Sequence, residues 1–361
     1  MRVALLGYGL AGRYFHRPLV TATAGLELTT VVTRHPGRRA QARAEVPGVR
    51  LLGTADELWP LAGDHDLVVV ATPTGTHTAL AARAIAAGLP VVVDKPLAAD
   101  AAAARRLADT AQAAGLALVP FHNRHWDSDH LTLRSLLGRG VLGDVLRYEA
   151  RFERWRPTPD PSAWREALPA TEGGGVLLDL GVHLVDQALD LFGPVHAVYA
   201  EVDARRGGAD DDVFVALHHG TGVRSHLWVG AMAGAPGPRL RVLGSHAAFV
   251  HDALDGQEDA LRAGEDPAAA AFGAEPPARW GRLRRGEADG TGEPVPAEPG
   301  RWPAFYAGVA ATLRDGDPPP VRAEEAVAGL EVLEAARASA AEDRIVMLSG
   351  SLGSGPVGVP E

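Results

Sequence analysis

The sequence of 361 residues predicts an α/β protein with a doubly wound, mostly parallel sheet followed by an α+β domain. Over the first 120 residues, short apolar runs alternate with Ala-rich, helix-compatible stretches, which is typical of strands joined by crossover helices. After residue 120, strand-type segments follow one another without helices between them. This change indicates a second domain built on a large, mainly antiparallel, open sheet.

The elements of the first domain can be placed in order along the chain. The run 67–71 is continuously apolar and has the length of a strand buried on both faces. A helix is expected from the glycine cluster after the first strand to about residue 23, and Ala-rich helices are expected at about 76–88 and 99–114. The remaining strands are expected at 2–6, 26–33, 91–93 and 116–120.

The second domain is expected to carry one strong helix at about 174–192 and a final amphipathic helix at 323–340. Its strands are expected at 144–153, 197–203, 212–219 and 223–228. Residues 255–300 are rich in Gly, Pro and charge, and a loop of that length is functional or partly disordered. These patterns predict domains at 1–120 and 121–349 and a flexible tail at 350–361.

Composition excludes several classes of function. The formal net charge is −10, which argues against nucleic acid or an anionic membrane as a bulk partner. The absence of cysteine excludes disulfides, thiol nucleophiles and Cys-ligated metals. We see neither an apolar stretch long enough to span a membrane nor a signal peptide, so we expect a cytoplasmic protein.

A glycine fingerprint follows the first expected strand. Gly7, Gly9 and Gly12 form the pattern Gly-x-Gly-x-x-Gly, with Tyr8, Leu10 and Ala11 between them. In this context the glycines permit a tight turn, close approach of a pyrophosphate, and packing of helix on strand. The helix N-terminus then faces the anion. The first domain is therefore predicted to be a Rossmann domain that binds NAD or NADP.

The end of the second strand bears on the choice of cofactor. NAD-binding domains normally place an acid there for the adenosine ribose, but this stretch has none. Thr33 and Arg34 are placed to hold a 2′-phosphate, with Arg38 or Arg39 nearby. The alternative is a solvated, basic start to the next helix. NADP is favoured, and NAD remains the alternative.

Lys95 is the single lysine among 35 Lys and Arg residues. It follows the apolar run 91–93, and its neighbours are Asp94 and Pro96. A guanidinium effectively never gives up a proton, whereas a lysine ammonium is compact and can be tuned to exchange one. The placement favours a role that arginine cannot fill, over the alternative of a leftover surface lysine.

Two further segments carry candidate site residues. Thr72, Pro73, Thr74 and His77 follow an apolar strand, where a turn meets the nicotinamide side of a Rossmann cofactor. On the expected helix 174–192, Asp179 and His183 are four residues apart and share a face. A carboxylate beside an imidazole supports proton transfer near neutral pH, although such a pair is more often structural. There is no convincing third ligand for a metal.

Together these motifs resemble the glucose–fructose oxidoreductase / inositol dehydrogenase (Gfo/Idh/MocA) family, and most closely its bacterial scyllo-inositol dehydrogenase-like subgroup. The family has an N-terminal glycine fingerprint, a Glu-Lys-Pro motif and an Asp-x-x-x-His pair. Here the middle motif departs at its first residue, because Asp94 precedes Lys95. The resembling stretches are 7–19, 122–129 and 173–187.

The resemblance implies an NAD(P)-dependent dehydrogenase that acts on a secondary alcohol of a cyclic polyol or sugar. His183 would accept the hydroxyl proton as hydride leaves the same carbon. Lys95 would stabilise the developing negative charge on the oxygen, and Asp179 would bind a neighbouring hydroxyl and keep the lysine charged. Asp94 and Lys95 would also lie against the cofactor. The resemblance further implies a homodimer or homotetramer assembled through the open sheet face.

Candidate substrate contacts come from two segments. Asn123, Arg124 and Trp126 follow the last strand of the first domain and so approach the cleft, and Trp164 and Arg165 are added to them. Core packing is the alternative for the tryptophans. Two other functions stay open: a glycoside hydrolase that oxidises its sugar transiently on a retained nicotinamide, and a cofactor-binding regulator without activity.

Overall fold

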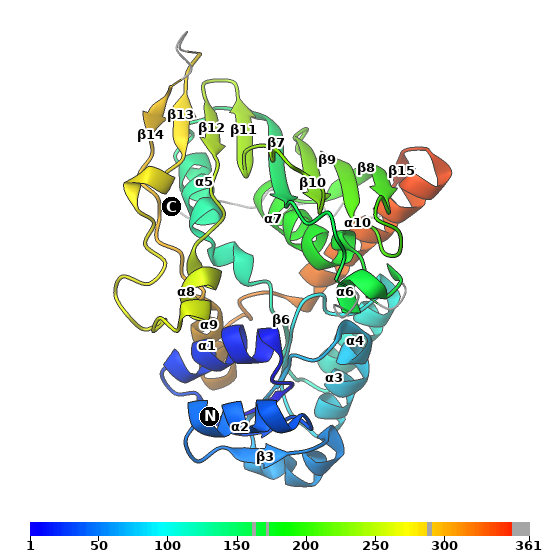
Figure 1. The fold of residues 1–361 in the computed structure, drawn as a ribbon, viewed down its shortest axis with the longest axis vertical. Coiled ribbons are helices and arrows are strands. Elements are labelled where there is room, and N and C mark those ends of the chain that lie inside the picture. Colours follow the sequence, from blue (N-terminus) through cyan, green and yellow to red (C-terminus); the bar gives the residue numbers. More distant parts are fainter. Residues whose placement is uncertain (161–163, 171–172, 287–290, 349–361) are drawn as a thin grey trace.

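The computed structural model describes residues 1–160, 164–170, 173–286 and 291–348. It contains two sheets, one in each half of the molecule (Figure 1). The smaller sheet has six parallel strands in the order β3-β2-β1-β4-β5-β6, and the larger has nine strands, mostly antiparallel. The predicted fold class is therefore confirmed.

The first sheet has the strand order of a doubly wound nucleotide-binding fold, with the order reversing between β1 and β4. A π turn over Gly12–His16 opens the helical segment after β1. The strands are β1 (Arg2–Leu6), β2 (Glu27–Val32), β3 (Arg50–Leu52), β4 (Leu67–Val70), β5 (Val91–Val93) and β6 (Leu118–Pro120). The helices are α1 (Arg17–Ala22), α2 (Pro36–Glu45), α3 (His77–Ala86) and α4 (Ala101–Ala113).

The central strands are apolar throughout because both of their faces are covered. Along β4, every residue is buried. Val68 and Val70 point to one core cluster, whereas Leu67 and Val69 point to the other, as the two-residue period of a strand requires. This explains why the sequence shows continuous runs here rather than alternation.

The second sheet has the order β14-β13-β12-β11-β7-β10-β9-β8-β15, and its one parallel pair joins β7 to β10. Its longer strands are β7 (Val145–Glu153), β8 (Val195–Asp203), β9 (Asp212–His219), β10 (Arg224–Gly230), β11 (Leu240–Gly244) and β12 (Ala248–His251). The short ones are β13 (Arg282–Arg284), β14 (Glu293–Pro294) and β15 (Val346–Met347). The four strands expected from sequence are all present, whereas β11 to β15 were not expected.

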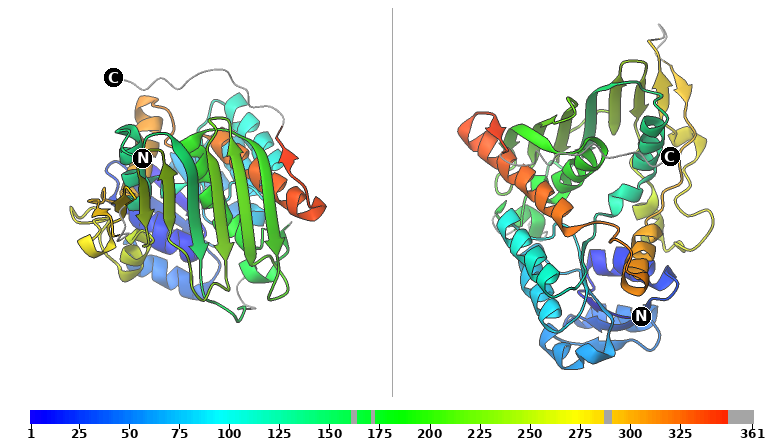
Figure 2. Two further views of the ribbon diagram at one scale, coloured as in Figure 1. Left: turned by 90° about the horizontal axis from the view of Figure 1, so that it is seen from above. Right: turned by 180° about the vertical axis from the view of Figure 1, so that it is seen from behind.

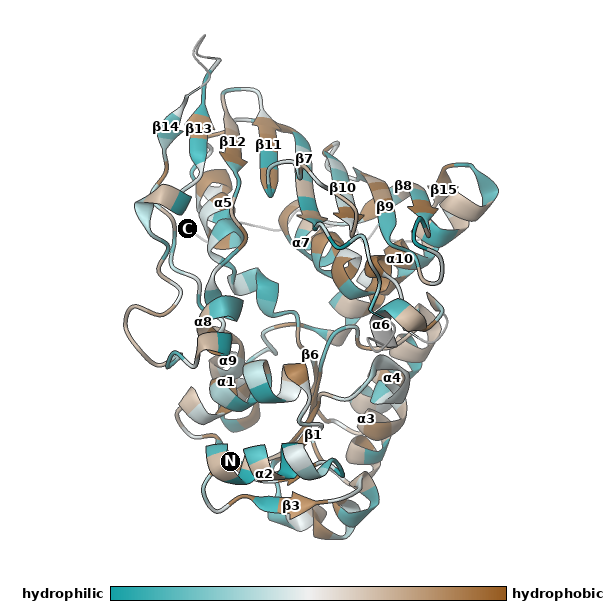
Figure 3. Cartoon of the chain, in the orientation of Figure 1, coloured by the Kyte–Doolittle hydropathy of each residue, from teal (hydrophilic) through white to brown (hydrophobic). Residues whose placement is uncertain are grey.

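Helices cover only one face of this sheet. Val213, Val215 and Leu217 of β9 are buried in the same cluster as α7 (Val182–Phe192) and α10 (Ala323–Glu342). Brown colouring in Figure 3 marks these apolar elements. The opposite face is open along its whole width (Figure 2, left). The helix α5 (Ser128–Gly138) connects the two domains.

The segment 255–300, expected as one long loop, contains short regular elements. These are α8 (Gln257–Ala263), a 3-10 turn at Pro277–Arg279, and the hairpin of β13 and β14. Buried polar groups hold it in place: the Gln257 amide donates to the Trp126 carbonyl and accepts from the Trp302 backbone N–H. Composition alone does not reveal such anchors, because they depend on contacts distant in sequence.

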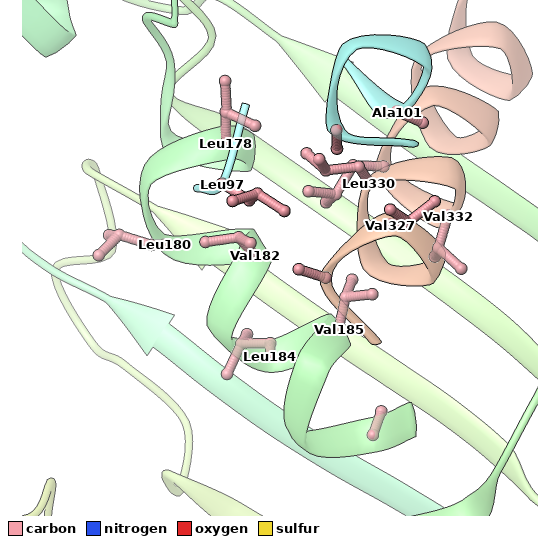
Figure 4. Packing of buried hydrophobic residues seen from close by; sticks show 14 of the residues in the cluster. Leu97, Ala101, Leu178, Leu180, Val182, Leu184, Val185, Val327, Leu330 and Val332 are labelled. Atoms are coloured by element: carbon pink, nitrogen blue, oxygen red, sulfur yellow. The ribbon is translucent and has the colours of Figure 1, made fainter. Parts of the chain in front are cut away.

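Two late helices tie the halves together. α9 (Pro303–Asp315) returns to the first domain, where Phe305 packs edge-on against Phe121 at 4.8 Å between ring centroids. α10 packs against α4, β8 and α7. Figure 4 shows Val327 and Leu330 of α10 with Leu97, Ala101 and Val185 in one apolar cluster. Helices from the C-terminal part of the sequence therefore contribute to the apolar packing around the first sheet.

None of the described helices is long and apolar enough to cross a bilayer.

Candidate active site

Two adjoining cavities lie on the first domain, and the first of them also borders the second domain. The first has a volume of about 800 Å³ and lies between the π turn after β1, the Lys95 loop, and the second domain. The second has a volume of about 560 Å³ and covers the glycine turn and the end of β2. Leu10, Ala11 and Asp94 line both cavities, so the two are adjoining parts of one cleft.

The glycine turn has the shape that a dinucleotide needs. A Cβ on Gly7 would lie 2.3 Å from the Ala71 carbonyl oxygen, and one on Gly12 would lie 2.1 Å from the Gly7 carbonyl oxygen. Both glycines are thus required by backbone packing. A Cβ on Gly9 would meet nothing closer than the Arg38 guanidinium at 3.7 Å. Gly9 thus leaves open space beside the backbone, which is what close approach of a pyrophosphate requires in a dinucleotide-binding turn.

The far end of the second cavity is basic. Thr33, Arg34 and Arg38 line it, and Asp94, at its other end, is the only acid among the described lining residues. Arg39 is engaged elsewhere: its guanidinium donates to the carbonyls of Thr33 and Leu51. Arg34 therefore lines the cavity as expected, and of the two alternatives Arg38 and Arg39 only Arg38 does so.

The turn after β4 divides into residues that line the second cavity and residues that support the turn from behind. Thr72 and Pro73 line the second cavity, together with Tyr8 of the glycine turn. Thr74 and His77 line neither cavity. The two ring nitrogens of buried His77 lie 2.8 Å from the carbonyl oxygens of Thr72 and Pro96, so His77 ties this turn to the Lys95 loop.

Lys95 and Asp179 form an ion pair across the cleft. Lys95 Nζ lies 2.8 Å from Asp179 Oδ1 and donates also to the Asp179 carbonyl oxygen, at 2.5 Å. Both side chains are mostly buried and line the first cavity. The pair joins the end of β5 in the nucleotide domain to the helical segment that precedes α7.

That segment is not the regular helix expected at 174–192. Leu177–Gly181 forms a π turn, and α7 begins at Val182. Turns of this kind are rare and occur often at functional sites. Asp179 lies within the π turn and His183 in the first turn of α7, and both side chains still reach the first cavity. Asp179 and His183 therefore face the same cavity, as expected, but through a π turn followed by a helix rather than through one regular helix.

His183 is buried, and its surroundings keep it neutral. Burial lowers the pKa of His183 well below 6.5, and the positive charges of Lys95 and Arg124 lower it further. Its Nδ1 has no hydrogen-bond partner among the described residues. A neutral imidazole at the wall of the cavity can accept a proton at neutral pH.

Asp94 is held inside the protein as a carboxylate. Its Oδ1 accepts from the Lys95 backbone N–H and lies 3.7 Å from His16 Nε2, while His16 Nδ1 lies 2.7 Å from the Tyr306 hydroxyl. Burial alone would raise the pKa of Asp94, but His16 and Lys95 lower it to about 2. Its charge is therefore present throughout the neutral range.

Behind His183, α7 carries a second acidic residue that faces two histidines. Asp186 Oδ2 lies 2.8 Å from His125 Nε2 and 3.3 Å from His122 Nδ1, and all three side chains are buried. Burial alone would lower the pKa of His125, but the charges of Asp186 and Asp190 raise it to about 9. The segment 122–126 is thereby held against α7 by charge.

Only some of the residues expected to contact the substrate line the first cavity. Asn123 and Arg124 line the first cavity, and Arg124 is paired with Asp127 and Glu258. Trp126 is not among the lining residues and packs against Phe305 instead. Trp164 and Arg165 begin the short helix α6 (Trp164–Ala167), and their side chains lie outside the described part of the structure.

The first cavity also includes charged residues that the sequence did not single out. Two of them, Arg154 and Arg156, follow β7, and the acids Asp255 and Glu258 come from the segment expected as a loop. Arg206, Arg262 and Arg279 complete the basic lining. The only signal for Arg154 and Arg156 was their two-residue spacing at the end of a strand, which is common in surface strands.

The fold and the cleft together define a nicotinamide-dependent oxidoreductase. Comparison with known proteins agrees: residues 1–122 match the model of an oxidoreductase family with an NAD-binding Rossmann fold, and residues 130–250 match the GFO/IDH/MocA C-terminal domain. The chain belongs to the Gfo/Idh/MocA family, whose members act on CH–OH groups with NAD or NADP.

Several relatives match over nearly their whole length. The scyllo-inositol 2-dehydrogenase (NADP(+)) IolW of Bacillus subtilis is 35% identical over 96% of both chains. The uncharacterized oxidoreductase YdgJ of Escherichia coli is 37% identical over 92% of this chain and 94% of its own. Among solved structures, yvaA of Bacillus subtilis has a TM-score of 0.90 at 34% identity, covering 96% of this chain and 98% of its own.

Proposed function

We propose that this enzyme transfers a hydride between a secondary alcohol of a cyclic polyol or sugar and NADP. The observation that carries the proposal is the meeting of Lys95, Asp179 and His183 at one cavity, which adjoins the cavity over the glycine turn. The name of the relative IolW, which states scyllo-inositol and NADP(+), supports the substrate class and the cofactor.

The protein's own part in the reaction is to position the alcohol and handle its proton. A bound nicotinamide accepts or returns the hydride. His183, kept neutral by burial and nearby cations, takes the hydroxyl proton as the carbonyl forms. Lys95 donates a hydrogen bond to the reacting oxygen and stabilises its developing negative charge. Asp179 holds the ammonium in place through its ion pair and binds a neighbouring hydroxyl of the substrate.

Preference for NADP rests on the basic end of the second cavity. Thr33, Arg34 and Arg38 supply a hydroxyl and two guanidinium groups, and the acid that usually binds the adenosine ribose of NAD is missing. Replacing Arg38 by Leu is expected to raise KM for NADP about tenfold or more and to leave KM for NAD within about twofold. Equal effects on both cofactors would contradict the assignment.

The decisive experiment follows nicotinamide absorbance with NADP and with NAD against a panel of inositols and aldoses. Lys95→Ala serves as the control. We expect NADP reduction by at least one cyclic polyol or sugar, and its loss in the control. Measurable cofactor binding without reduction by any alcohol would remove the proposal. It would favour a hydrolase with a retained nicotinamide, or a regulator.

A further inference from the structure

Arg154 and Arg156 are fixed side by side on the wall of the first cavity. Residues 154–156 continue β7 as extended chain: the backbone N–H groups of Arg154 and Arg156 donate to the carbonyls of Gly230 and Ala231, and Trp155 bridges to Met232. Alternation along such a segment places 154 and 156 on one side and Trp155 on the other. Both arginines line the cavity, whereas Trp155 is 61% exposed.

These two cations differ from all others in the cavity. Every other lysine or arginine that lines it has a carboxylate within 4 Å: Lys95 with Asp179, Arg124 with Asp127, Arg206 with Asp211, Arg262 with Glu258, and Arg279 with Glu275. In the described part of the chain, the guanidinium groups of Arg154 and Arg156 have neither an ion pair nor a hydrogen bond.

An unpaired, half-buried guanidinium beside other cations is unfavourable. Arg154 loses hydration in the cavity wall, and Arg156 and Arg124 add repulsion, so the pKa of Arg154 is lowered. A protein that only needed a folded cavity wall would place a carboxylate here, as it does for the other five cations, or an apolar side chain. An arrangement that costs stability without a ligand indicates a binding function.

Arg154 lies within electrostatic reach of the reaction centre, since both Asp179 and Glu258 act on its charge. A group bound by Arg154 would thus belong to the molecule whose alcohol meets Lys95 and His183. Neutral hydroxyls could accept hydrogen bonds from the two guanidinium groups, but they would add no negative charge to the attraction that Asp179 and Glu258 supply, and the pKa of Arg154 is lowered despite that attraction. A carboxylate or phosphate supplies both the acceptors and the opposite charge, and guanidinium forks match both.

We propose that the substrate carries an anionic substituent, a carboxylate or a phosphate, and that Arg154, assisted by Arg156, binds it and sets specificity. This inference rests on the proposed function, whose polyol or sugar it narrows to an acidic or phosphorylated one. The two anions share the chemistry that the site recognises, and the test separates them.

The test compares ring-matched probes on the enzyme with bound NADP(H). Equilibrium binding by calorimetry is measured for D-glucose, D-glucuronate and D-glucose 6-phosphate, and for myo-inositol with its monophosphate. We expect at least one anionic probe to bind about ten- to a hundredfold tighter than its neutral counterpart. Preference for the uronate or for the phosphates tells the two anions apart.

Arg154→Gln should abolish this preference while changing affinity for the neutral probe less than about threefold. Arg156→Gln should reduce the preference in part. Arg314→Gln, in the last turn of α9 and paired with Asp315 on the surface, serves as the matched control and should behave as wild type. Without ligand, Arg154→Gln should leave Tm unchanged or raise it, because the guanidinium it removes has neither an ion pair nor a hydrogen bond among the described residues.

Three results would overturn the inference: no anionic probe binding tighter than its neutral counterpart, an equal loss for both probes in Arg154→Gln, or a lower Tm of that variant without ligand. Failure of the proposed function is recognised separately. In that case anionic probes still bind through Arg154, but no alcohol in any panel reduces the cofactor.

Discussion

Lys95 shows what one ammonium contributes in a chain whose other strong bases are all arginine. Its Nζ reaches both the side-chain and the backbone oxygen of Asp179, which lie on one residue of a π turn. A compact point donor on a flexible stem can satisfy this pair and still present a proton to a substrate oxygen. A planar, larger guanidinium would have to displace the π turn to do the same.

Replacing Lys95 by Arg is therefore expected to lower kcat/KM at least about a hundredfold. The charge is retained, but the group is planar and bulkier, so it cannot keep both contacts to Asp179 and also place a donor on the reacting oxygen. Fluorescence titration with the nicotinamide should show cofactor affinity within a few-fold of wild type. Arg314→Lys is the matched conservative control. Near-normal turnover of the Lys95→Arg variant would remove Lys95 from the reaction.

The pH dependence of oxidation should reflect the neutral state of His183. The base must be unprotonated to act, and protonation occurs only below its pKa. Because burial and nearby cations lower that pKa well below 6.5, activity should persist to pH values below 6.5 before the acid limb appears. The profile of kcat/KM against pH measures this. An acid limb centred above 6.5 would contradict the assignment of His183 as base.

At the scale of elements, two glycines of the same turn have different roles: Gly12 is needed for backbone packing, and Gly9 for approach of the cofactor. Gly12→Ala places a Cβ 2.1 Å from a backbone oxygen, and we expect a loss of about 3 kcal/mol or more in the free energy of unfolding. Gly9→Ala meets open space, so its stability should change by less than about 1 kcal/mol, while cofactor affinity falls about tenfold or more. Thermal melts and cofactor titration of the pair test this contrast.

The helix α7 is held to the segment 122–126 by buried charge. Removing one partner of such a pair leaves the other charge uncompensated, at a cost of about 3–5 kcal/mol. Asp186→Asn, which leaves His125 without its carboxylate, should therefore destabilise the fold by about that amount. Asp190→Asn, nearer the surface, should cost less. Urea unfolding of both variants checks the order.

The same contact predicts a pH dependence of stability. The pKa of His125 is raised from 6.5 to about 9 in the folded state, so its contribution is fully present below pH 6.5 and is lost as the pH rises through 9. The difference in free energy of unfolding between wild type and His125→Gln should thus be largest near pH 6 and shrink toward pH 9.5. A difference that grows with pH would refute a charged His125.

At the scale of the whole molecule, the face of the nine-stranded sheet that no described helix covers is a candidate surface for association with a second copy. Tyr199, Phe214, His226 and Trp228 form a contiguous set of half-exposed aromatic rings on this face. We propose that two copies associate through it, as a homodimer or within a homotetramer. Light scattering should show an oligomer for the wild type and a smaller species for Phe214→Asp. A monomeric wild type would exclude the assembly.

The sequence was informative where a pattern is local. The glycine turn, the apolar strands of the first domain and the helix 323–340 follow from spacing and from runs of side chains. The π turn at 177–181 was not predictable, because five residues there have ordinary helical composition. The packing of Trp126 against Phe305, the short elements within 255–300 and the lack of an ion pair for Arg154 among the described residues depend on tertiary contacts, which local sequence patterns do not reveal.

Because α9 returns to the first sheet, the core of the first domain is not built from one continuous stretch of chain. Phe305, Tyr306 and Val309 share an apolar cluster with Val3, Leu5 and Val69, so a fragment ending near residue 120 would lose part of the apolar cover on one face of its sheet. A transfer of the first domain to another protein would therefore preserve its complete apolar core only if α9 were transferred with it.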